Sequence, residues 1–413
     1  MYSSNAPPGM HVEGVLQEHV ARASELLALL RASTLEFRDS DVADDMWRQC
    51  DANLDALRIA GEAAIAKAEA AMGDDPDAAG VLALLLAEDE SVDSADASRA
   101  QRAVNLLHHE SSEIRQAAWF GLRLATSAST HQHLTALARE PTRFAAWAAA
   151  LDILAFHRRP VASPLDLSDM PREGADEVAW LLAEAASRMP AAWGVVDLER
   201  FLGHQLRCVR EAALRASARC GLVELPAICR AATEHVAPLE AIEFLGVVGS
   251  HDDLPRLQRA ASTPATARSG VIALGRLGLV GAMPTLLYLL DEGDLVEAAA
   301  AAITRITGDE LPRGAVPQPP PGMTEDELDL WEPVAPVDAP HAREWWATRA
   351  PHFDSRKRYQ LGVCVSDDPL GPTFDQLPSG IRCDVYLRQR ALVAGTPDRE
   401  LETWPWKREV HLR

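Results

Sequence analysis

Apolar residues recur every three or four positions over most of the chain, a pattern typical of helices buried along one face. Segment 41–72 predicts either one long helix or a pair broken near Gly61, because glycine weakens a helix interior. The other clear segments of this kind are 12–30, 113–122, 144–156 and 177–188. The pattern therefore predicts an all-α protein.

Proline and glycine repeat with a nearly fixed period between residues 195 and 308. Pro226, Pro255 and Pro284 are 29 residues apart, within the stretches ELPAI, DLPRL and AMPTL. Glycines follow the same period, with gaps of 28, 29 and 30 residues, at Gly221, Gly249, Gly278 and Gly308. A period of this length indicates a repeat architecture.

Each period predicts two helices. Pro255 suits the first turn of one helix, where its missing N–H group costs nothing. Gly278 suits the left-handed position that ends the next helix. The second helices read VREAALRASARC, LEAIEFLGVV, ARSGVIALGRL and VEAAAAAITRIT. Because no pair can bury its apolar face alone, we expect the pairs to stack into an α-solenoid.

The segment 195–308 resembles HEAT repeats of the short type found in bacterial proteins. Two further segments resemble an uncharacterised bacterial family with HEAT-like repeats. One is DANLDALRIAGEA at 51–63, which is similar to that family's AHLDGLRVAG signature but has Ala56 in place of a glycine. The other is the tail from KRYQLG at 357–362 to Trp404. Members of the family tend to be encoded beside type VI secretion components, so the resemblance implies an accessory or interaction role there.

The composition divides the chain into four parts. We expect an acidic helical region at 1–110, the HEAT-like solenoid at 111–310, a proline-rich connector at 311–340 and a tryptophan-bearing tail of mixed structure at 341–413. The tail is expected to pack back on the solenoid. Its predicted helices are 344–349 and 381–393, and its predicted strands are 359–365 and 401–412.

The charge and the apolar runs exclude several classes of protein. The net charge is −21, and the first 100 residues hold 20 acidic and 7 basic side chains. Such an acidic chain opposes nucleic-acid binding, which needs clustered cations. No apolar run reaches the ~18–20 residues that span a membrane, and the N-terminus lacks a signal pattern, so we expect a cytoplasmic protein.

Six cysteines without a CxxC pair predict buried or half-buried thiols: Cys50, Cys208, Cys220, Cys229, Cys364 and Cys383.

The residues that usually carry catalysis do not form a recognisable set. No GxxxxGK[ST], GxSxG or HExxH motif occurs. The clusters His108-His109-Glu110 and His131-Gln132-His133 place their histidines on different helix faces, so neither forms a compact pair of metal ligands. Deoxyhypusine hydroxylase, a HEAT-like enzyme, builds its di-iron site from repeated His-Glu dipeptides. The single dipeptide His109-Glu110 cannot build such a site. We therefore expect no catalytic residue, no cofactor and no metal site. A HEAT-like phycobilin lyase or DNA glycosylase stays as an enzymatic alternative.

The sequence thus predicts a non-catalytic scaffold that binds a partner protein, such as a secretion component or effector, on the solenoid surface. The candidate contact residues, most of them expected at exposed turns and helix starts, are Arg210, Glu211, Glu240, Arg268, Glu297, Trp345 and Trp346. Structural roles stay open, because Arg115 and Arg210 could bridge repeats through carboxylates and the tryptophans could pack on the last repeat. An immunity protein that neutralises a basic partner is the alternative that the acidic N-terminal region favours. The partner's identity and the oligomeric state stay open.

Overall fold

The structure is a computed structural model. It describes residues 8–33, 40–87, 94–125, 127–139, 143–159, 175–188, 202–235, 238–320, 322–324, 331, 334–366, 369–396 and 401. Within these residues the regular structure is helical apart from one hairpin of two short strands, which confirms the all-α class. None of the helices described is both long enough and apolar enough to cross a membrane.

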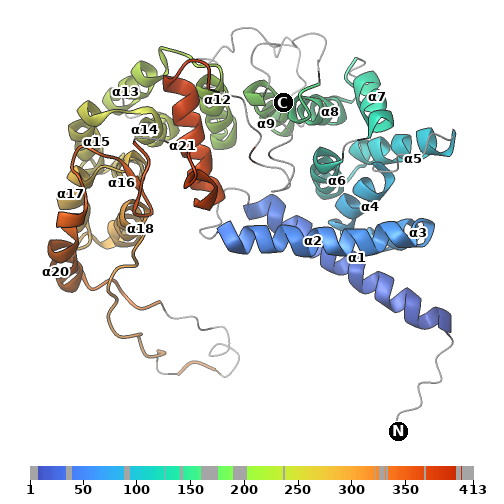
Figure 1. Cartoon of the computed structure of the whole chain (residues 1–413), viewed down its shortest axis with the longest axis horizontal. Helices are drawn as coiled ribbons and strands as arrows, with labels where there is room; N and C mark the ends of the chain where they lie inside the picture. The colour runs from blue at the N-terminus through green and yellow to red at the C-terminus, as the bar shows by residue number, and fades with distance from the viewer. Residues whose placement is uncertain are drawn as a thin grey trace. The chain divides into compact units, whose positions relative to one another are not determined.

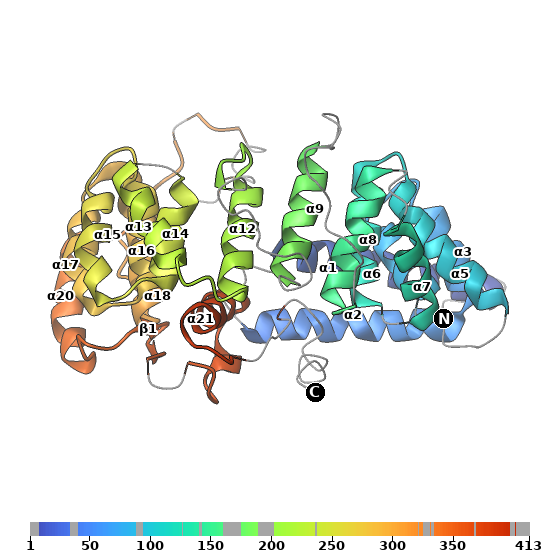
Figure 2. The same cartoon turned by 90° about the horizontal axis from the view of Figure 1, so that it is seen from above.

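The chain divides into two compact units. The first comprises residues 1–220, 378–383 and 395–413, and the second comprises residues 221–377 and 384–394. The boundary before Gly221 lies inside the segment 111–310. Helices of both units are labelled in Figure 1 and Figure 2.

The first unit is built from helices throughout the residues described. In chain order these are α1 (Pro8–Ser33), α2 (Ser40–Ala60), α3 (Glu62–Ala71), α4 (Ala78–Ala87), α5 (Ser94–Asn105), the 3-10 helix η1 (Leu106–His108), α6 (Ser112–Leu124), α7 (Ala128–Leu137), α8 (Phe144–Phe156), α9 (Ala175–Arg188) and α12 (Arg207–Arg219). The helices predicted at 12–30, 113–122, 144–156 and 177–188 are confirmed as α1, α6, α8 and α9.

The centre of the first unit is α4, whose residues are all buried. It packs against α1, α3, α5 and α6. Gly61 has φ = +56° and separates α2 from α3, so the broken pair, and not one long helix, is the form observed. The core continues through α6 and α8 to α9, and α9 packs in turn against α12.

The second unit combines helix pairs with most of the described tail. In chain order its elements are α13 (Leu225–His235), α14 (Leu239–Val248), η3 (His251–Asp253), α15 (Leu254–Ala261), α16 (Ala267–Leu277), η4 (Val280–Ala282), α17 (Met283–Leu289), η5 (Gly293–Leu295), α18 (Val296–Thr307), α20 (Ala339–Arg349), η6 (Ala350–His352), β1 (Tyr359–Gln360), β2 (Val363–Cys364), η7 (Phe374–Gln376) and α21 (Ser379–Leu392), of which residues 384–392 belong here.

The helix ends in the second unit follow the predicted proline and glycine pattern. Pro255 lies in the first turn of α15 and Pro284 in that of α17. Gly278 and Gly308 end α16 and α18 in the left-handed conformation. The second helices α14, α16 and α18 lie side by side, as both views show (Figure 1 and Figure 2). A Cβ atom on Gly246 would lie 2.3 Å from the Ala273 carbonyl oxygen, so glycine is required for this close packing.

The tail contacts the ends of these second helices through backbone hydrogen bonds. The Tyr359 N–H group donates to the Gly278 carbonyl (2.8 Å), and the Gly362 N–H group donates to the Ile306 carbonyl (3.0 Å). The single strand predicted at 359–365 is wrong in detail, because Leu361 and Gly362 have positive φ angles and turn the chain between β1 and β2. The predicted strand 401–412, apart from residue 401, and Trp404 and Trp406 lie outside the described residues.

Two arginines of the tail, the buried Arg358 and the half-buried Arg388, bind the C-terminal end of α14. Arg358 donates to the carbonyl oxygens of Gly246 (2.9 Å) and Gly249 (3.1 Å), and Arg388 donates to those of Val247 (3.1 Å) and Gly249 (2.6 Å). The last carbonyls of a helix lack partners within the helix, so these guanidinium groups satisfy them. Burial lowers the pKa of Arg388 to about 10, which leaves it protonated near neutral pH.

Candidate functional site

The first unit has a hollow of about 290 Å³ where the last turn of α1 meets one face of α6, α9 and α12. We call it the hollow below. Its lining combines aromatic rings, arginines and glutamates from segments far apart in the sequence. The lining residues are Arg31, Ala32, Gln116, Trp119, Phe120, Arg123, Trp180, Glu184, Arg188, Cys208, Glu211 and Arg215.

Two tryptophans form the apolar surface of the hollow. The rings of Trp119 and Trp180 lie edge to face, with centroids 5.1 Å apart, a favourable arrangement for aromatic pairs. Trp119 is buried, and its indole N–H group donates to Asp152 (2.8 Å). Trp180 is half-buried. The Arg123 guanidinium lies 4.6 Å from the centre of the Trp119 ring, in a cation–π contact.

A buried network of charges lies beneath these rings. Asp152 is fully buried and pairs with Arg188 (2.8 Å), which also pairs with Glu184 (3.1 Å). Glu184 pairs in turn with Arg215 of α12. Burial raises the pKa of Asp152, although Arg188 and Arg123 oppose the shift. The network joins α8, α9 and α12, and its ion pairs fix the helices that carry the hollow.

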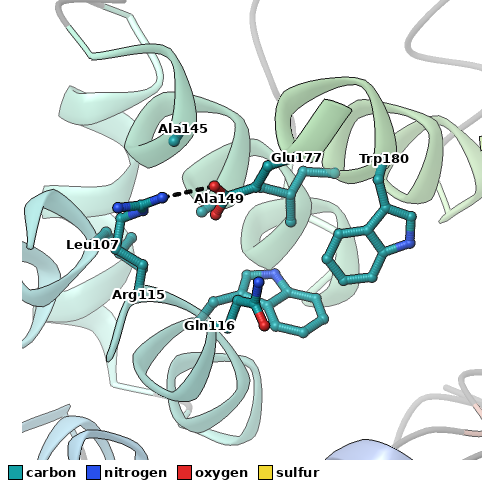
Figure 3. A pocket seen from close by; sticks show the side chains of 9 residues that line it. Leu107, Arg115, Gln116, Ala145, Ala149, Glu177 and Trp180 are labelled. Carbon is teal, nitrogen blue, oxygen red and sulfur yellow. Dashed lines mark hydrogen bonds and ion pairs between the residues drawn. The ribbon is translucent and has the colours of Figure 1, made fainter. Parts of the chain in front are cut away.

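A further ion pair joins α6 to α9 next to the hollow. Arg115 pairs with Glu177 at 2.7 Å, as the dashed line in Figure 3 shows, and it also donates to the carbonyls of His109 and Glu110. Trp180 follows Glu177 on α9 by less than one turn (Figure 3). The pair therefore joins the helices that carry Trp119 and Trp180.

Arg210 of α12 makes the same backbone contacts as Arg115 of α6. Its guanidinium donates to the carbonyls of His204 (2.6 Å) and Gln205 (2.8 Å), which precede it by six and five residues, as His109 and Glu110 precede Arg115. In both places an arginine near the start of a helix holds the preceding turn.

Arg31 and Glu211 lie at the rim of the hollow. Arg31 donates through Nη2 to Asp77 (2.8 Å), whereas its Nη1 has no hydrogen-bond partner among the residues described. Its side chain is 26% exposed. Glu211 pairs with Arg207 one turn earlier on α12 (2.7 Å). The lining thus contains an arginine whose Nη1 is buried and has no partner among the described residues, together with the two tryptophans.

The structure separates the residues that the sequence selected for partner contact. Arg210 and Glu211 lie on α12 of the first unit, and of these two only Glu211 lines the hollow. Arg268 is exposed near the start of α16, and Glu297 is exposed on α18 with a two-bond contact to Arg313 (3.1 and 3.2 Å).

Glu240 was expected to be exposed, and this is wrong. It is 5% exposed, because α14 is buried along nearly its whole length between neighbouring helices. Its carboxylate therefore cannot contact a partner in the folded chain.

Trp345 and Trp346 lie together on α20, half-buried, and join an aromatic cluster of the tail. The ring centroids of Trp346 and Phe353 are 5.6 Å apart, and those of Phe353 and Tyr359 are 4.9 Å apart. This cluster belongs to the second unit, whereas the hollow belongs to the first.

The cysteines fall into a buried and an exposed group. Burial raises the pKa of Cys50 and of Cys229 to about 12. Cys208 and Cys220 are exposed, contrary to the expectation of buried or half-buried thiols. Cys208 lies in the first turn of α12, and Cys220 directly follows its last residue. All six cysteines fall in described segments, and none is in a disulfide.

The sequence analysis missed most of the hollow, although a signal for it was present. Arg115, Trp119 and Arg123 are spaced by four residues along α6, and Trp180, Glu184 and Arg188 have the same spacing along α9. Residues four apart lie on one helix face, so each helix carries an aromatic residue within a charged stripe. A single helix does not reveal that the two stripes face one hollow.

Within the described ranges, no group of three or more His, Cys, Asp or Glu side chains is placed to hold a metal ion. The acids that line the hollow, Glu184 and Glu211, are in ion pairs with arginines. Such groups suit binding and structural roles. No protein-family model and no curated protein sequence matches this chain.

Proposed function

We propose that this chain is an α-solenoid of HEAT-like helix pairs that binds a partner protein on its surface without catalysing a reaction, in the bacterial cytoplasm. The observation that carries the proposal is the hollow on α6, α9 and α12. It presents tryptophan surface within a rim of charged side chains, on helices fixed by buried ion pairs.

The composition of the hollow supports protein binding over catalysis. Tryptophan and arginine are the residue types most enriched at the energetic centres of protein interfaces. A catalytic site would need an acid, base or nucleophile with a group to activate it. In the hollow the two glutamates are paired with arginines, and burial raises the pKa of the Cys208 thiol, which makes it a poorer nucleophile.

The packing of the second helices supports the solenoid part of the proposal. α14 packs on α16 and α16 on α18, and in the first unit α9 packs on both α8 and α12. Stacked pairs of this kind expose helix surface whose side chains can vary without loss of the core. The resemblance to a family encoded beside type VI secretion components makes a secretion component or effector our proposed class of partner.

A second candidate function is neutralisation of a basic partner, as in an immunity protein. It is favoured by the 20 acidic and 7 basic side chains among the first 100 residues. Attraction between opposite net charges is long-ranged and is screened by salt. This function therefore predicts an affinity that falls steeply between low and moderate salt concentration.

The test is to isolate the tagged full-length chain from its own cells at low and at moderate salt, and to identify proteins that co-purify. Any recovered protein is then purified and mixed with the chain, and the stoichiometry is measured by analytical ultracentrifugation. A defined complex at both salt concentrations supports the scaffold, and a complex lost at moderate salt supports neutralisation. Failure to recover any specific protein at either salt concentration would overturn both.

A further inference from the structure

We propose that the hollow binds a segment of the partner in which an apolar side chain lies next to a carboxylate. The apolar side chain would contact Trp180, and the carboxylate would accept hydrogen bonds from Arg31. This inference rests on the proposed function and adds the chemistry of the segment that is recognised.

The hollow has a volume of about 290 Å³, which side chains of a partner protein can fill. One large apolar side chain with the head of a neighbouring residue fills a space of this size. A bound peptide would keep the rest of its chain outside the hollow, along α9 and α12.

Trp180 is the residue that would contact the apolar side chain of the segment. Its ring is half-buried and packs on Trp119, which is itself fixed by the hydrogen bond to Asp152. A rigid aromatic surface of this kind binds apolar side chains with little loss of conformational entropy. Removing the exposed part of Trp180 from water gives the apolar contribution to binding.

Arg31 is the residue that would donate hydrogen bonds to the carboxylate of the segment. One nitrogen of its guanidinium pairs with Asp77, and Nη1 lacks a partner among the residues described. About a quarter of the side chain is exposed but Nη1 is buried, so the proposal requires the guanidinium to turn toward the hollow when the carboxylate binds. A donor without a partner is costly, and a carboxylate acceptor removes that cost.

The second unit contains an internal example of this recognition. Asp384 of α21 lies against two arginines, each in the last turn of a second helix: Arg305 of α18 (2.6 Å) and Arg276 of α16 (3.5 Å). Val385, the next residue, is an apolar neighbour of that carboxylate and is buried. Arg31 likewise lies in the last turn of its helix, α1. The chain thus already places a carboxylate, followed by a buried apolar residue, against arginines in the last turns of helices.

The experiment is selection of peptides from a random dodecapeptide display library on the immobilised full-length chain. Four proteins are compared: the wild type, Arg31→Glu, Trp180→Ala and the matched control Arg22→Glu. Arg22 lies on the same helix as Arg31, is exposed and pairs with Glu25 outside the hollow. The control therefore has the same change of charge without a change in the lining. Circular dichroism establishes that each variant is folded.

We expect the wild type and Arg22→Glu to enrich peptides with an aromatic or aliphatic residue next to Asp or Glu. Arg31→Glu and Trp180→Ala should bind these peptides at least ten-fold more weakly. As an independent readout, a saturating synthetic peptide of the enriched sequence should slow the reaction of Cys208 with N-ethylmaleimide. Cys208 lines the hollow, whereas Cys220 does not and serves as the internal reference.

Three outcomes would overturn the inference: enrichment of basic or uncharged peptides, equal binding by Arg31→Glu, and no enrichment on the wild type. If peptides or the isolated partner bind but ignore Arg31 and Trp180, the hollow is excluded as the binding site and the scaffold function stands. If co-purification also fails, the proposed function itself falls. The two failures are therefore distinguishable.

Discussion

The N–H group of Tyr359 in the tail donates a 2.8 Å hydrogen bond to the carbonyl oxygen of Gly278, the residue that ends α16. A Cβ atom on Gly278 would lie 2.3 Å from the Tyr359 carbonyl oxygen. Gly308 has the same relationship to Leu361, whose carbonyl oxygen would lie 2.5 Å from an added Cβ atom. These glycines therefore do two things: they end their helices with positive φ angles, and they leave room for the tail.

Gly278→Ala should lower the free energy of unfolding of the second unit by about 3 kcal/mol. Roughly 1 kcal/mol comes from the positive φ angle, and the rest comes from displacement of the tail strand. Urea denaturation followed by circular dichroism measures the change. Gly293→Ala is the control, because Gly293 also has a positive φ angle but has open space around it. Equal losses of unfolding free energy in the two variants would contradict the close packing of the tail against Gly278.

Arg358→Met should destabilise the second unit by about 3 kcal/mol. Replacing a buried charge by an apolar side chain is often neutral, but here it would remove the Arg358 donor from the Gly246 carbonyl and leave the Gly249 carbonyl with Arg388 alone. Arg356→Met, two residues earlier, should leave the stability nearly unchanged, because Arg356 is exposed and its ion pair is with the nearby Asp354. Thermal unfolding of both variants tests this difference. Equal stability of Arg358→Met and the wild type would contradict the capping role.

Asp253→Asn should lower the stability of the second unit by about 2 kcal/mol at pH 7, and the loss should shrink in acid. Burial alone would raise the pKa of Asp253, but two hydrogen bonds from Arg230 and one from the Ser250 N–H group hold it below 3.8. The stabilisation is therefore fully present above pH 3.8 and disappears as the pH falls through the lower pKa of the folded state.

Urea denaturation of the wild type and Asp253→Asn between pH 3 and pH 7 measures this effect. Asp252→Asn serves as the control, because Asp252 is the exposed neighbour in the same turn. The difference in stability between Asp253→Asn and the wild type should shrink toward pH 3. If it stays constant across this range, the charge of Asp253 is not the cause of the loss of stability.

Cys208 should react with a thiol reagent at pH 8 at least a hundred-fold faster than Cys50 or Cys229 in the folded chain. Cys208 is exposed to the reagent although its pKa is also raised, whereas Cys50 and Cys229 are buried and have pKa values of about 12, which reduces their thiolate about a thousand-fold from a pKa of 9.0. Labelling followed by peptide mapping gives the individual rates. The three rates should become similar in 6 M guanidinium chloride, and similar rates in the folded chain would contradict the burial of Cys50 and Cys229.

The sequence predicted the helices and most of their ends because those features depend on nearby residues. Gly61 breaks the helical segment 41–72, Pro255 occupies a first turn, and Gly278 ends a helix, each through its own backbone preferences. The 29-residue period was visible for the same reason. These conformational preferences belong to the residues themselves, so they can be predicted from the local sequence without the fold.

Only the tertiary structure decided which side chains are buried and which meet. Glu240 looks like an exposed residue at a helix start, yet neighbouring helices cover it. Trp119 and Trp180 are 61 positions apart in the sequence, and their contact depends on how α6 and α9 are placed by the helices packed around them. Burial and long-range contacts arise from the packing of many helices, and no short window of sequence contains that information.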